Sequence, residues 1–445
     1  MTSSSPSARS LALETLDRVF FGGAYSHIAL ASALDEADLS RADRGLATEL
    51  VYGTLTRKRT LDTLLGTFVD RPIDGLDRPV LLSLRMAAYQ LVFLDRIPQH
   101  AAVHEAVELV KAQCSRGAAG FTNGVLRSML RKRKRWNIWE TIDPEKEQVR
   151  YLGVRHSLPN WIVALLIDAH GFTGAERQAK AFNTRPPLYF RTLEKSDGAP
   201  PDGVSPVAGV PGCFRAESMS GELMESIRQH RMVIQDLGSQ LIGHFATADG
   251  ARRILDACAG LGGKALHLAQ LADAEASVVA IEPHQSKLTE LRKTVADTSF
   301  EDRIELFHGE LADFSDDSDD FDLVLVDAPC SGLGVIRRHP ETRWRRTQKD
   351  VDNRAALQKK LLAQAATHVS PGGLLVYGVC TFTEEEGPDQ TEEFLRDHSD
   401  FEREAPPKES EIDWSRFINE SGDLELNPAD HDTDAFYAAR LRRRA

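Results

Sequence analysis

Apolar strands alternate with helical stretches through the second half of this chain of 445 residues. Five segments have the short, apolar character of buried strands: 253–258, 277–282, 304–307, 323–327 and 374–378. Helical stretches fall between most of them, at 267–271, 286–294 and 353–368. Because parallel neighbours need a crossover connection, which is usually a helix, this alternation predicts a doubly wound parallel sheet.

Two cysteines follow the last two of these strands. Cys330 comes just after 323–327 and Cys380 just after 374–378, and Asp327 precedes the first cysteine by three residues. Both strands are apolar throughout, which is typical of strands buried on both faces of a parallel sheet. Ligands of such sheets bind beyond the carboxyl ends of the strands. We therefore expect the carboxyl group and both thiols on one rim, where they favour covalent catalysis over redox or metal chemistry.

The first third of the chain has the periodicity of a helical bundle. Apolar residues recur at three- and four-residue spacing in 8–20, 47–55, 79–94 and 101–110. The pattern then becomes mixed and is interrupted by Pro- and Gly-rich stretches, which predicts a small α/β connector. We expect three parts: a helical domain at 1–138, a connector at 139–230 and a catalytic domain at 231–445.

Composition excludes several classes of protein. The net charge of −13 counts against a nucleic-acid partner, but basic residues gather in 127–136 and 337–346. Either run can grip phosphate or form a solvated helix face. The five cysteines are odd in number, scattered and without C-x-x-C spacing, which argues against disulfides and a zinc site. No apolar stretch reaches the length of a membrane span, and the first residues lack signal-peptide features, so we expect a cytoplasmic protein.

A glycine-rich loop, 258–264, follows the first strand and opens a helix. Glycines let the backbone approach a ligand closely. Glu282 ends the next strand, where a carboxylate can accept hydrogen bonds from ribose hydroxyls. The spacing is Gly-x-Gly-Gly, so the dinucleotide fingerprint fails and a nicotinamide dehydrogenase is disfavoured. Together, the loop and Glu282 favour an adenosine-containing cofactor over a purely structural turn.

The residues at the rim also have structural interpretations. A carboxyl group at the position of Asp327 can hydrogen-bond the N3 and N4 edge of a flipped cytosine, or it can cap the following helix. A free cysteine is often simply a small buried hydrophobic residue. A purely structural role explains any one of Asp327, Cys330 and Cys380 more readily than it explains all three on the same rim. The residues alone leave open which cysteine attacks.

These motifs resemble those of the Sun/RsmB/Fmu family of RNA 5-methylcytosine methyltransferases. Segment 327–344 is similar to the family's fourth motif, 376–381 with 384–386 to its sixth, and 258–264 to its S-adenosylmethionine loop. Residues 7–136 resemble the NusB-like RNA-binding domain of the bacterial ribosomal member. The resemblance covers nearly the whole chain. It implies a NusB-like helical bundle, a small connector and a Rossmann-like methyltransferase domain.

The resemblance also implies a reaction, methylation of cytosine C5 in small-subunit (16S) rRNA with S-adenosyl-L-methionine. Cys380 would add to C6 of the base, which makes C5 nucleophilic. Asp327 would hold the base at N3, and Cys330 would assist the elimination that releases the product. Lys264 would lie near the base and the methyl donor, where its charge could lower the pKa of a nearby thiol.

By the same resemblance, Glu282 would bind the ribose and Glu310 would lie near the adenine. The full set of implied cofactor contacts is Cys258, Ala259, Gly260, Leu261, Gly262, Gly263, Lys264, Glu282, Glu310 and Asp327. The implied partner is rRNA, gripped at its phosphates by the arginine-rich segments. We expect a monomer that binds neither a metal nor a membrane.

Six positions depart from the family pattern. Glu282 and Glu310 stand where the family usually has aspartates. Leu261 and Ala265 replace Pro and Thr of the cofactor loop, Val379 replaces the Thr or Ser before the nucleophile, and Gly387 replaces an Asn. None of these changes removes a catalytic group. They motivate one alternative, an RNA-binding ribosome-assembly factor of the same fold with impaired catalysis. A second alternative is the same chemistry on another RNA, such as tRNA.

Overall fold

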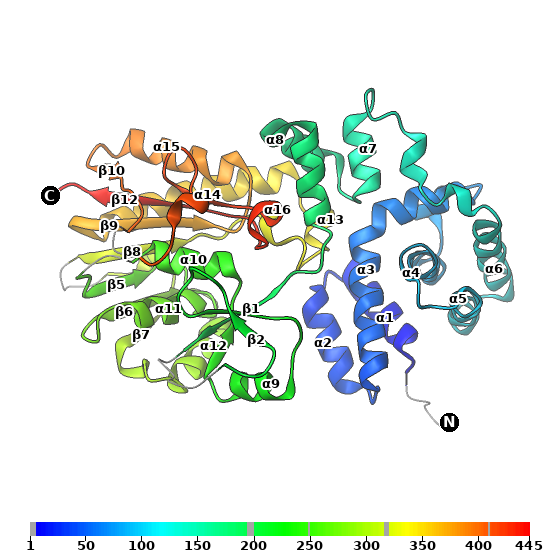
Figure 1. The fold of residues 1–445 in the computed structure, drawn as a ribbon, viewed down its shortest axis with the longest axis horizontal. Coiled ribbons are helices and arrows are strands. Elements are labelled where there is room, and N and C mark those ends of the chain that lie inside the picture. The colour runs from blue at the N-terminus through cyan, green and yellow to red at the C-terminus, as the bar shows by residue number, and fades with distance from the viewer. Residues whose placement is uncertain (1–5, 194–199, 248–249, 316–319, 408–409) are drawn as a thin grey trace. The chain divides into compact units, whose positions relative to one another are not determined.

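The computed structural model describes residues 6–193, 200–247, 250–315, 320–407 and 410–445 (Figure 1). The chain forms two compact units. The first contains Met1–Thr184 together with Ile336–Arg345, and the second contains Arg185–Val335 together with Arg346–Ala445. In the part of the chain that is described, no helix is long and apolar enough to cross a bilayer.

The first unit is helical, as the spacing of its apolar residues predicts. Its α-helices are α1 (Ala8–Phe20), α2 (Ser26–Glu36), α3 (Arg41–Gly66), α4 (Arg78–Phe93), α5 (Gln99–Gln113), α6 (Arg116–Arg131), α7 (Gln148–Arg155), α8 (Asn160–Ala181) and α13 (Thr342–Arg345). Short 3-10 turns lie at η1 (Ile73–Gly75), η2 (Arg133–Arg135) and η3 (Ile138–Thr141). Serine side chains cap the first turns of α1, α3 and α6 by accepting a backbone N–H, which stabilises those helix starts. Helix α4 is buried along most of its length and forms the centre of the bundle.

The segment Ile336–Arg345 packs within this helical unit, although it follows Cys330 in sequence. Arg343 is fully buried, and its guanidinium donates to the carbonyl oxygens of Phe182 at 3.1 Å and Ile336 at 3.2 Å and to Oδ1 of Asn183 at 2.8 Å. Arg345 likewise donates to backbone carbonyls of the unit. The expectation that this arginine-rich run grips RNA phosphate is therefore wrong for Arg343, because its guanidinium is buried and both terminal nitrogens donate to the protein's own acceptors.

The second unit is built on a large mixed sheet with strand order β10-β12-β9-β8-β5-β6-β7, and β11 pairs with β12 (Figure 1). Strands β5 to β9 run parallel, whereas β10, β11 and β12 join antiparallel. The strands are β5 (Arg253–Asp256), β6 (Ser277–Glu282), β7 (Ile304–His308), β8 (Phe321–Asp327), β9 (Val369–Val379), β10 (Phe401–Arg403), β11 (Leu424–Leu426) and β12 (Phe436–Arg443). The five predicted parallel strands are confirmed, and the antiparallel edge extends them.

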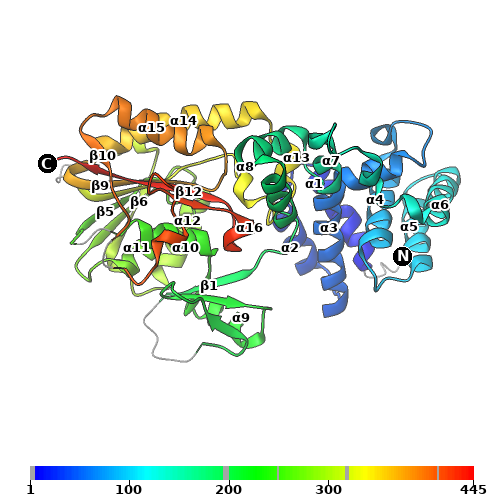
Figure 2. The same cartoon turned by 45° about the horizontal axis from the view of Figure 1, so that its top comes forward.

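Helices cover both faces of this sheet, as Figure 2 shows. Alternate residues of each strand enter opposite cores: Leu323 and Leu325 pack on one side, Val324 and Val326 on the other. The first face carries α10 (Leu237–Phe245), α11 (Gly263–Leu271) and α12 (Gln285–Ala296), and the second carries α14 (Gln348–Thr367) and α15 (Pro388–Asp397). The remaining short helices are η4 (Glu301–Arg303), η5 (Leu311–Asp313), η6 (Leu333–Val335), η7 (Glu384–Glu386), η8 (Trp414–Arg416) and α16 (Pro428–His431).

A second, smaller sheet has the order β2-β3-β1-β4 and is entirely antiparallel. Its elements are β1 (Leu188–Thr192), β2 (Val204–Pro206), β3 (Cys213–Ala216), β4 (Met232–Ile234) and the helix α9 (Gly221–Arg228). Within the predicted connector, α7 and α8 belong to the first unit, whereas β1, β2, β3 and α9 belong to the second. The three-part division at 138 and 230 stays a prediction.

The buried guanidinium of Arg343 should contribute strongly to stability. We expect Arg343→Ala to lower the free energy of unfolding by about 3 kcal/mol, because it leaves buried carbonyl oxygens without donors. Arg135→Ala removes an exposed guanidinium from the same unit and should change it by less than about 0.5 kcal/mol. Urea denaturation followed by circular dichroism measures both, and equal losses would contradict the assignment.

Candidate active site

The site lies where the order of the parallel strands reverses. Strands β5 and β8 are neighbours, and the chain continues outward from them in opposite directions, to β6 on one side and to β9 on the other. Such a switch point is where open α/β sheets bind ligands. Asp256 ends β5 and Asp327 ends β8, so two carboxyl groups face the same rim from adjacent strands.

The structure brings the two predicted thiols together. Cys330 follows β8, Cys380 is the first residue after β9, and their sulfur atoms are 3.2 Å apart. The hydrogen bond with Cys380, aided by burial, raises the pKa of the Cys330 thiol well above its ordinary value. A raised pKa favours the protonated form of Cys330, which can donate a hydrogen bond to the sulfur of Cys380.

Lys264 and Asp327 form an ion pair beside these thiols. The distance between Lys264 Nζ and Asp327 Oδ2 is 2.6 Å, and the lysine side chain is only 11% exposed. Burial lowers the pKa of Lys264, but the charge and hydrogen bond of Asp327, with a contribution from Cys380, outweigh it and raise the pKa overall. Lys264 therefore keeps its positive charge next to the carboxylate and the nucleophile candidate.

The glycine-rich loop turns tightly from β5 into α11. Gly262 has a φ of +84°, and a Cβ added there would lie 2.0 Å from Cδ1 of Leu291, so only glycine fits. The N–H of Ala259 donates to the carbonyl of Ile281 at 2.9 Å and ties the loop to β6. Leu261 lies at the tip of the loop and is 63% exposed. The backbone of the loop is thus free to approach a ligand.

The two predicted glutamates occupy different environments. Glu282 ends β6 and is 3% exposed, and its Oε1 accepts the N–H of His284 at 2.7 Å and lies 2.6 Å from that histidine's Nδ1. Glu310 follows β7, one strand further from the switch point, and is exposed. Hydrogen bonds to His284 therefore fix the Glu282 carboxylate near the loop. Glu310 is exposed and follows the outer strand β7.

Sequence reasoning missed the fully buried Asp256. Its Oδ1 accepts the N–H of Cys258 at 3.3 Å, while its Oδ2 has no hydrogen-bond partner among the described residues. Burial, followed by the nearby charge of Asp327, raises the pKa of Asp256 to about 7. The signal was available, because Asp256 ends a strand just as Asp327 and Glu282 do. Burial also raises the pKa of Cys258.

The departures from the family pattern are accommodated by local packing. Ala265 and Val379 are both fully buried. A Cβ at Gly387 would lie 3.2 Å from the carbonyl oxygen of Thr383 and from Cγ of Tyr437, which is tighter than ordinary contact. Glycine therefore suits this turn, and none of these positions removes a group from the rim.

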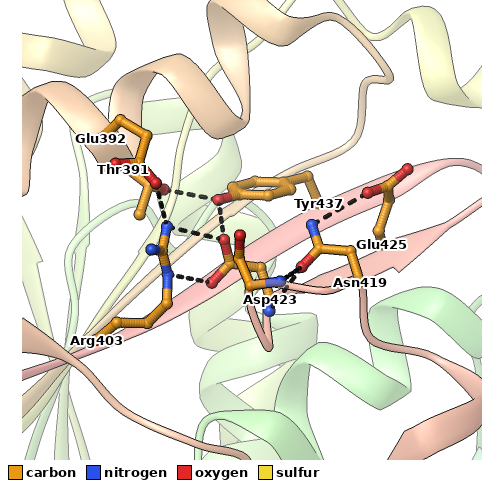
Figure 3. Close-up of polar contacts among 8 residues, drawn as sticks. Thr391, Glu392, Arg403, Asn419, Asp423, Glu425 and Tyr437 are labelled. Carbon is orange, nitrogen blue, oxygen red and sulfur yellow. Dashed lines mark hydrogen bonds and ion pairs between the residues drawn. The ribbon is translucent and has the colours of Figure 1, made fainter.

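A buried polar network supports the Cys380 loop from the neighbouring strand β12 (Figure 3). Tyr437 pairs with Val379, and its hydroxyl donates to Asp423 at 2.6 Å and accepts from the hydroxyl of Thr391 at 2.9 Å. Arg403 binds both oxygens of Asp423, at 3.0 and 3.2 Å. Bidentate pairing of this kind fixes geometry as well as charge, so the end of β9 is held firmly.

The raised pKa of Asp256 predicts a pH-dependent stability difference. The folded state binds this proton more tightly than the unfolded state, so its contribution to stability is lost as pH rises from about 4 to 7. Relative to wild type, Asp256→Asn should gain about 2 kcal/mol more at pH 8 than at pH 5. Chemical denaturation at both pH values measures this. The exposed Asp352→Asn is the control, and an equal gain at both pH values would contradict the argument.

Family models match both parts of the chain. Residues 245–442 match the model described as 16S rRNA methyltransferase RsmB/F, and residues 6–131 match the NusB family. The crystal structure of PH0851 has a TM-score of 0.78 and 20% identity and covers 97% of both chains, which shows the same fold.

Curated relatives match along the whole length. A Bacillus subtilis (strain 168) protein named "Probable ribosomal RNA small subunit methyltransferase B" is 32% identical and covers 98% of this chain and 99% of its own. The "Ribosomal RNA small subunit methyltransferase B" of Salmonella paratyphi B is 30% identical and covers 87% of this chain and 90% of its own. On this full-length similarity, the chain belongs to the 16S rRNA methyltransferase RsmB/F family.

Proposed function

We propose that this protein methylates C5 of a cytosine in small-subunit rRNA, using S-adenosyl-L-methionine and a covalent bond between Cys380 and C6 of the base. The observation that carries the proposal is the pair of thiols 3.2 Å apart beside the Lys264–Asp327 ion pair. Methyl transfer alone needs no cysteine nucleophile. Two thiols at the carboxyl edge of the sheet suit a base whose C5 must first be activated.

The residues around the glycine-rich loop fit the proposed cofactor. Gly262 gives the loop its tight turn against Leu291, Glu282 offers a carboxylate fixed by hydrogen bonds, and Oδ2 of Asp256, which has no hydrogen-bond partner among the described residues, offers another polar oxygen. The loop 258–264, Glu282, Glu310 and Asp327 would hold the cofactor. When bound, S-adenosyl-L-methionine supplies an electrophilic methyl group. The departures at Leu261 and Ala265 leave these acceptors in place.

The protein's own side chains would carry the covalent steps. The Cys380 thiolate adds to C6, forming an S–C6 bond and moving electron density to C5 and the N3 edge of the ring. Asp327, positioned by Lys264, would hold the base through a proton between its carboxyl group and N3, and that proton would neutralise the charge that the addition places on the ring. Once C5 carries the methyl group, the C5 proton would pass to water, the C–H electron pair would re-form the C5–C6 double bond, and the S–C6 pair would leave on the sulfur of Cys380. Cys330 would then donate its hydrogen bond to the departing thiolate.

The helical unit supplies a surface suited to RNA. Residues 131–135 are all exposed and basic. A cavity of about 480 Å³ between α5 and α6 is bordered by the polar and basic residues His100, His104, Asn123, Arg127 and Arg131 and by the apolar residues Val103, Val107 and Leu130. Positive charge at such a surface attracts phosphate despite the net charge of −13. We infer that this surface contacts the rRNA.

The two cysteines should respond differently to replacement. With unmodified 16S rRNA and labelled methyl donor, Cys380→Ala should lower the transfer rate at least about 1000-fold, because the nucleophile is lost. Cys330→Ala should instead accumulate a covalent protein–RNA adduct that survives denaturing electrophoresis. Cys114→Ala, in the helical unit, is the control and should behave as wild type.

Several outcomes would overturn the proposal. Full activity of Cys380→Ala would remove the nucleophile assignment, and methylation of tRNA but not rRNA would favour the other substrate. Tight RNA binding by wild type without cofactor binding in calorimetry would favour the non-catalytic assembly factor. Mapping methylcytosine on the treated rRNA identifies the modified base.

A further inference from the structure

We propose that Glu386 is a positioning residue for the methyl-transfer site, holding the Cys330 and Cys380 loops together so that their sulfur atoms stay in contact. The inference rests on the proposed function and extends it. Glu386 lies in η7, six residues after Cys380, and is fully buried, whereas Glu384 in the same turn is exposed. A buried carboxyl group away from the reacting atoms needs a structural reason.

The carboxylate of Glu386 joins three segments. Its Oε1 accepts the backbone N–H of Ser331 at 2.7 Å and Nε2 of Gln358 at 3.1 Å, and its Oε2 accepts the hydroxyl of Thr383 at 3.1 Å. Ser331 is the residue after Cys330, Gln358 belongs to α14, and Thr383 lies in the loop of Cys380. All three partners donate, so both oxygens act as acceptors, as an ionised carboxylate requires.

Further hydrogen bonds connect the residues next to the thiols. The hydroxyls of Ser331 and Thr381 are 3.1 Å apart, and each of these residues directly follows a cysteine of the pair. Nε2 of Gln358 also donates to the carbonyl of Pro329 at 3.1 Å, on the other side of Cys330. The distance between the sulfurs is therefore set by a closed network in which Glu386 is the only carboxylate that these hydrogen bonds reach.

Glu386 also acts on the thiols electrostatically. Its three hydrogen-bond partners are uncharged, so no direct ion pair with a described residue neutralises its negative charge. This charge adds to the effects of Cys380 and burial in raising the pKa of Cys330. Lys264, by contrast, interacts favourably with Cys380. The two charged groups thus distinguish the thiols: Glu386 contributes to the raised pKa of Cys330, whereas the positive charge of Lys264 lies near Cys380.

Glu386→Gln tests the inference, because it keeps the size of the side chain but removes its charge and turns one acceptor into a donor. We expect kcat for methyl transfer to fall at least about 30-fold, with the KM for rRNA within about threefold of wild type. Mass spectrometry should show faster iodoacetamide alkylation of Cys330 at pH 8. Glu384→Gln, the exposed neighbour, should leave kcat and alkylation unchanged.

Alkylation separates this inference from the proposed function, since it needs no RNA. If wild type transfers no methyl group, the proposed function fails, and the alkylation rates still report on Glu386. Wild-type kcat with an unchanged Cys330 alkylation rate in Glu386→Gln would overturn the inference. Should that variant not fold, Thr383→Val removes one hydrogen bond and keeps the charge. A several-fold loss of kcat there would support the inference, and an unchanged kcat would overturn it.

Discussion

Parallel pairing of β5 with β8 is the constraint on which the rest of the site depends. In this register Asp256 lies opposite Leu325, so the carboxyl ends of both strands reach the same rim. The helix that follows β5 then places Lys264 against Asp327, and β9, pairing with the far side of β8, adds Cys380. Groups separated by more than 100 residues in sequence converge because three adjacent strands end together.

Much of this could be predicted, because uninterrupted apolar runs are strong signals for strands buried on both faces. The runs 323–327 and 374–378 correspond to β8 and β9. The structure extends β9 back to Val369, across a Pro-Gly-Gly sequence that normally argues against a strand. Strand β12 was missed for a different reason. The arginines of β12 interrupt the apolar run that would predict a buried strand. The structure shows that one of them, Arg440, is buried and paired with Glu404.

Charged residues were the least predictable part of the chain, because their partners are distant in sequence. Arg343 looks like a phosphate ligand in its basic run, yet two of its acceptors, the carbonyl of Phe182 and the side-chain amide of Asn183, are more than 150 residues away. In the same way, 384–386 are three identical glutamates, and only the third is fully enclosed. Sequence reveals the residue type and its approximate place on the sheet. Whether a charged side chain binds a ligand or stabilises the fold depends on its burial and on its hydrogen-bond partners, which only the structure shows.

The same reasoning distinguishes two cysteines that the sequence leaves equivalent. Both follow a buried strand and both lie at the rim, so neither position nor residue type selects a nucleophile. The difference comes from the neighbouring charges: Lys264 stands near Cys380, and Glu386 is bonded to the loop of Cys330. In the proposed reaction, the raised pKa of Cys330 suits that thiol to donate a hydrogen bond to the departing sulfur, and the positive charge of Lys264 near Cys380 suits Cys380 to attack. Within the proposed reaction, the two thiols therefore have different roles because different charges lie next to them: Lys264 near Cys380, and Glu386 at the loop of Cys330.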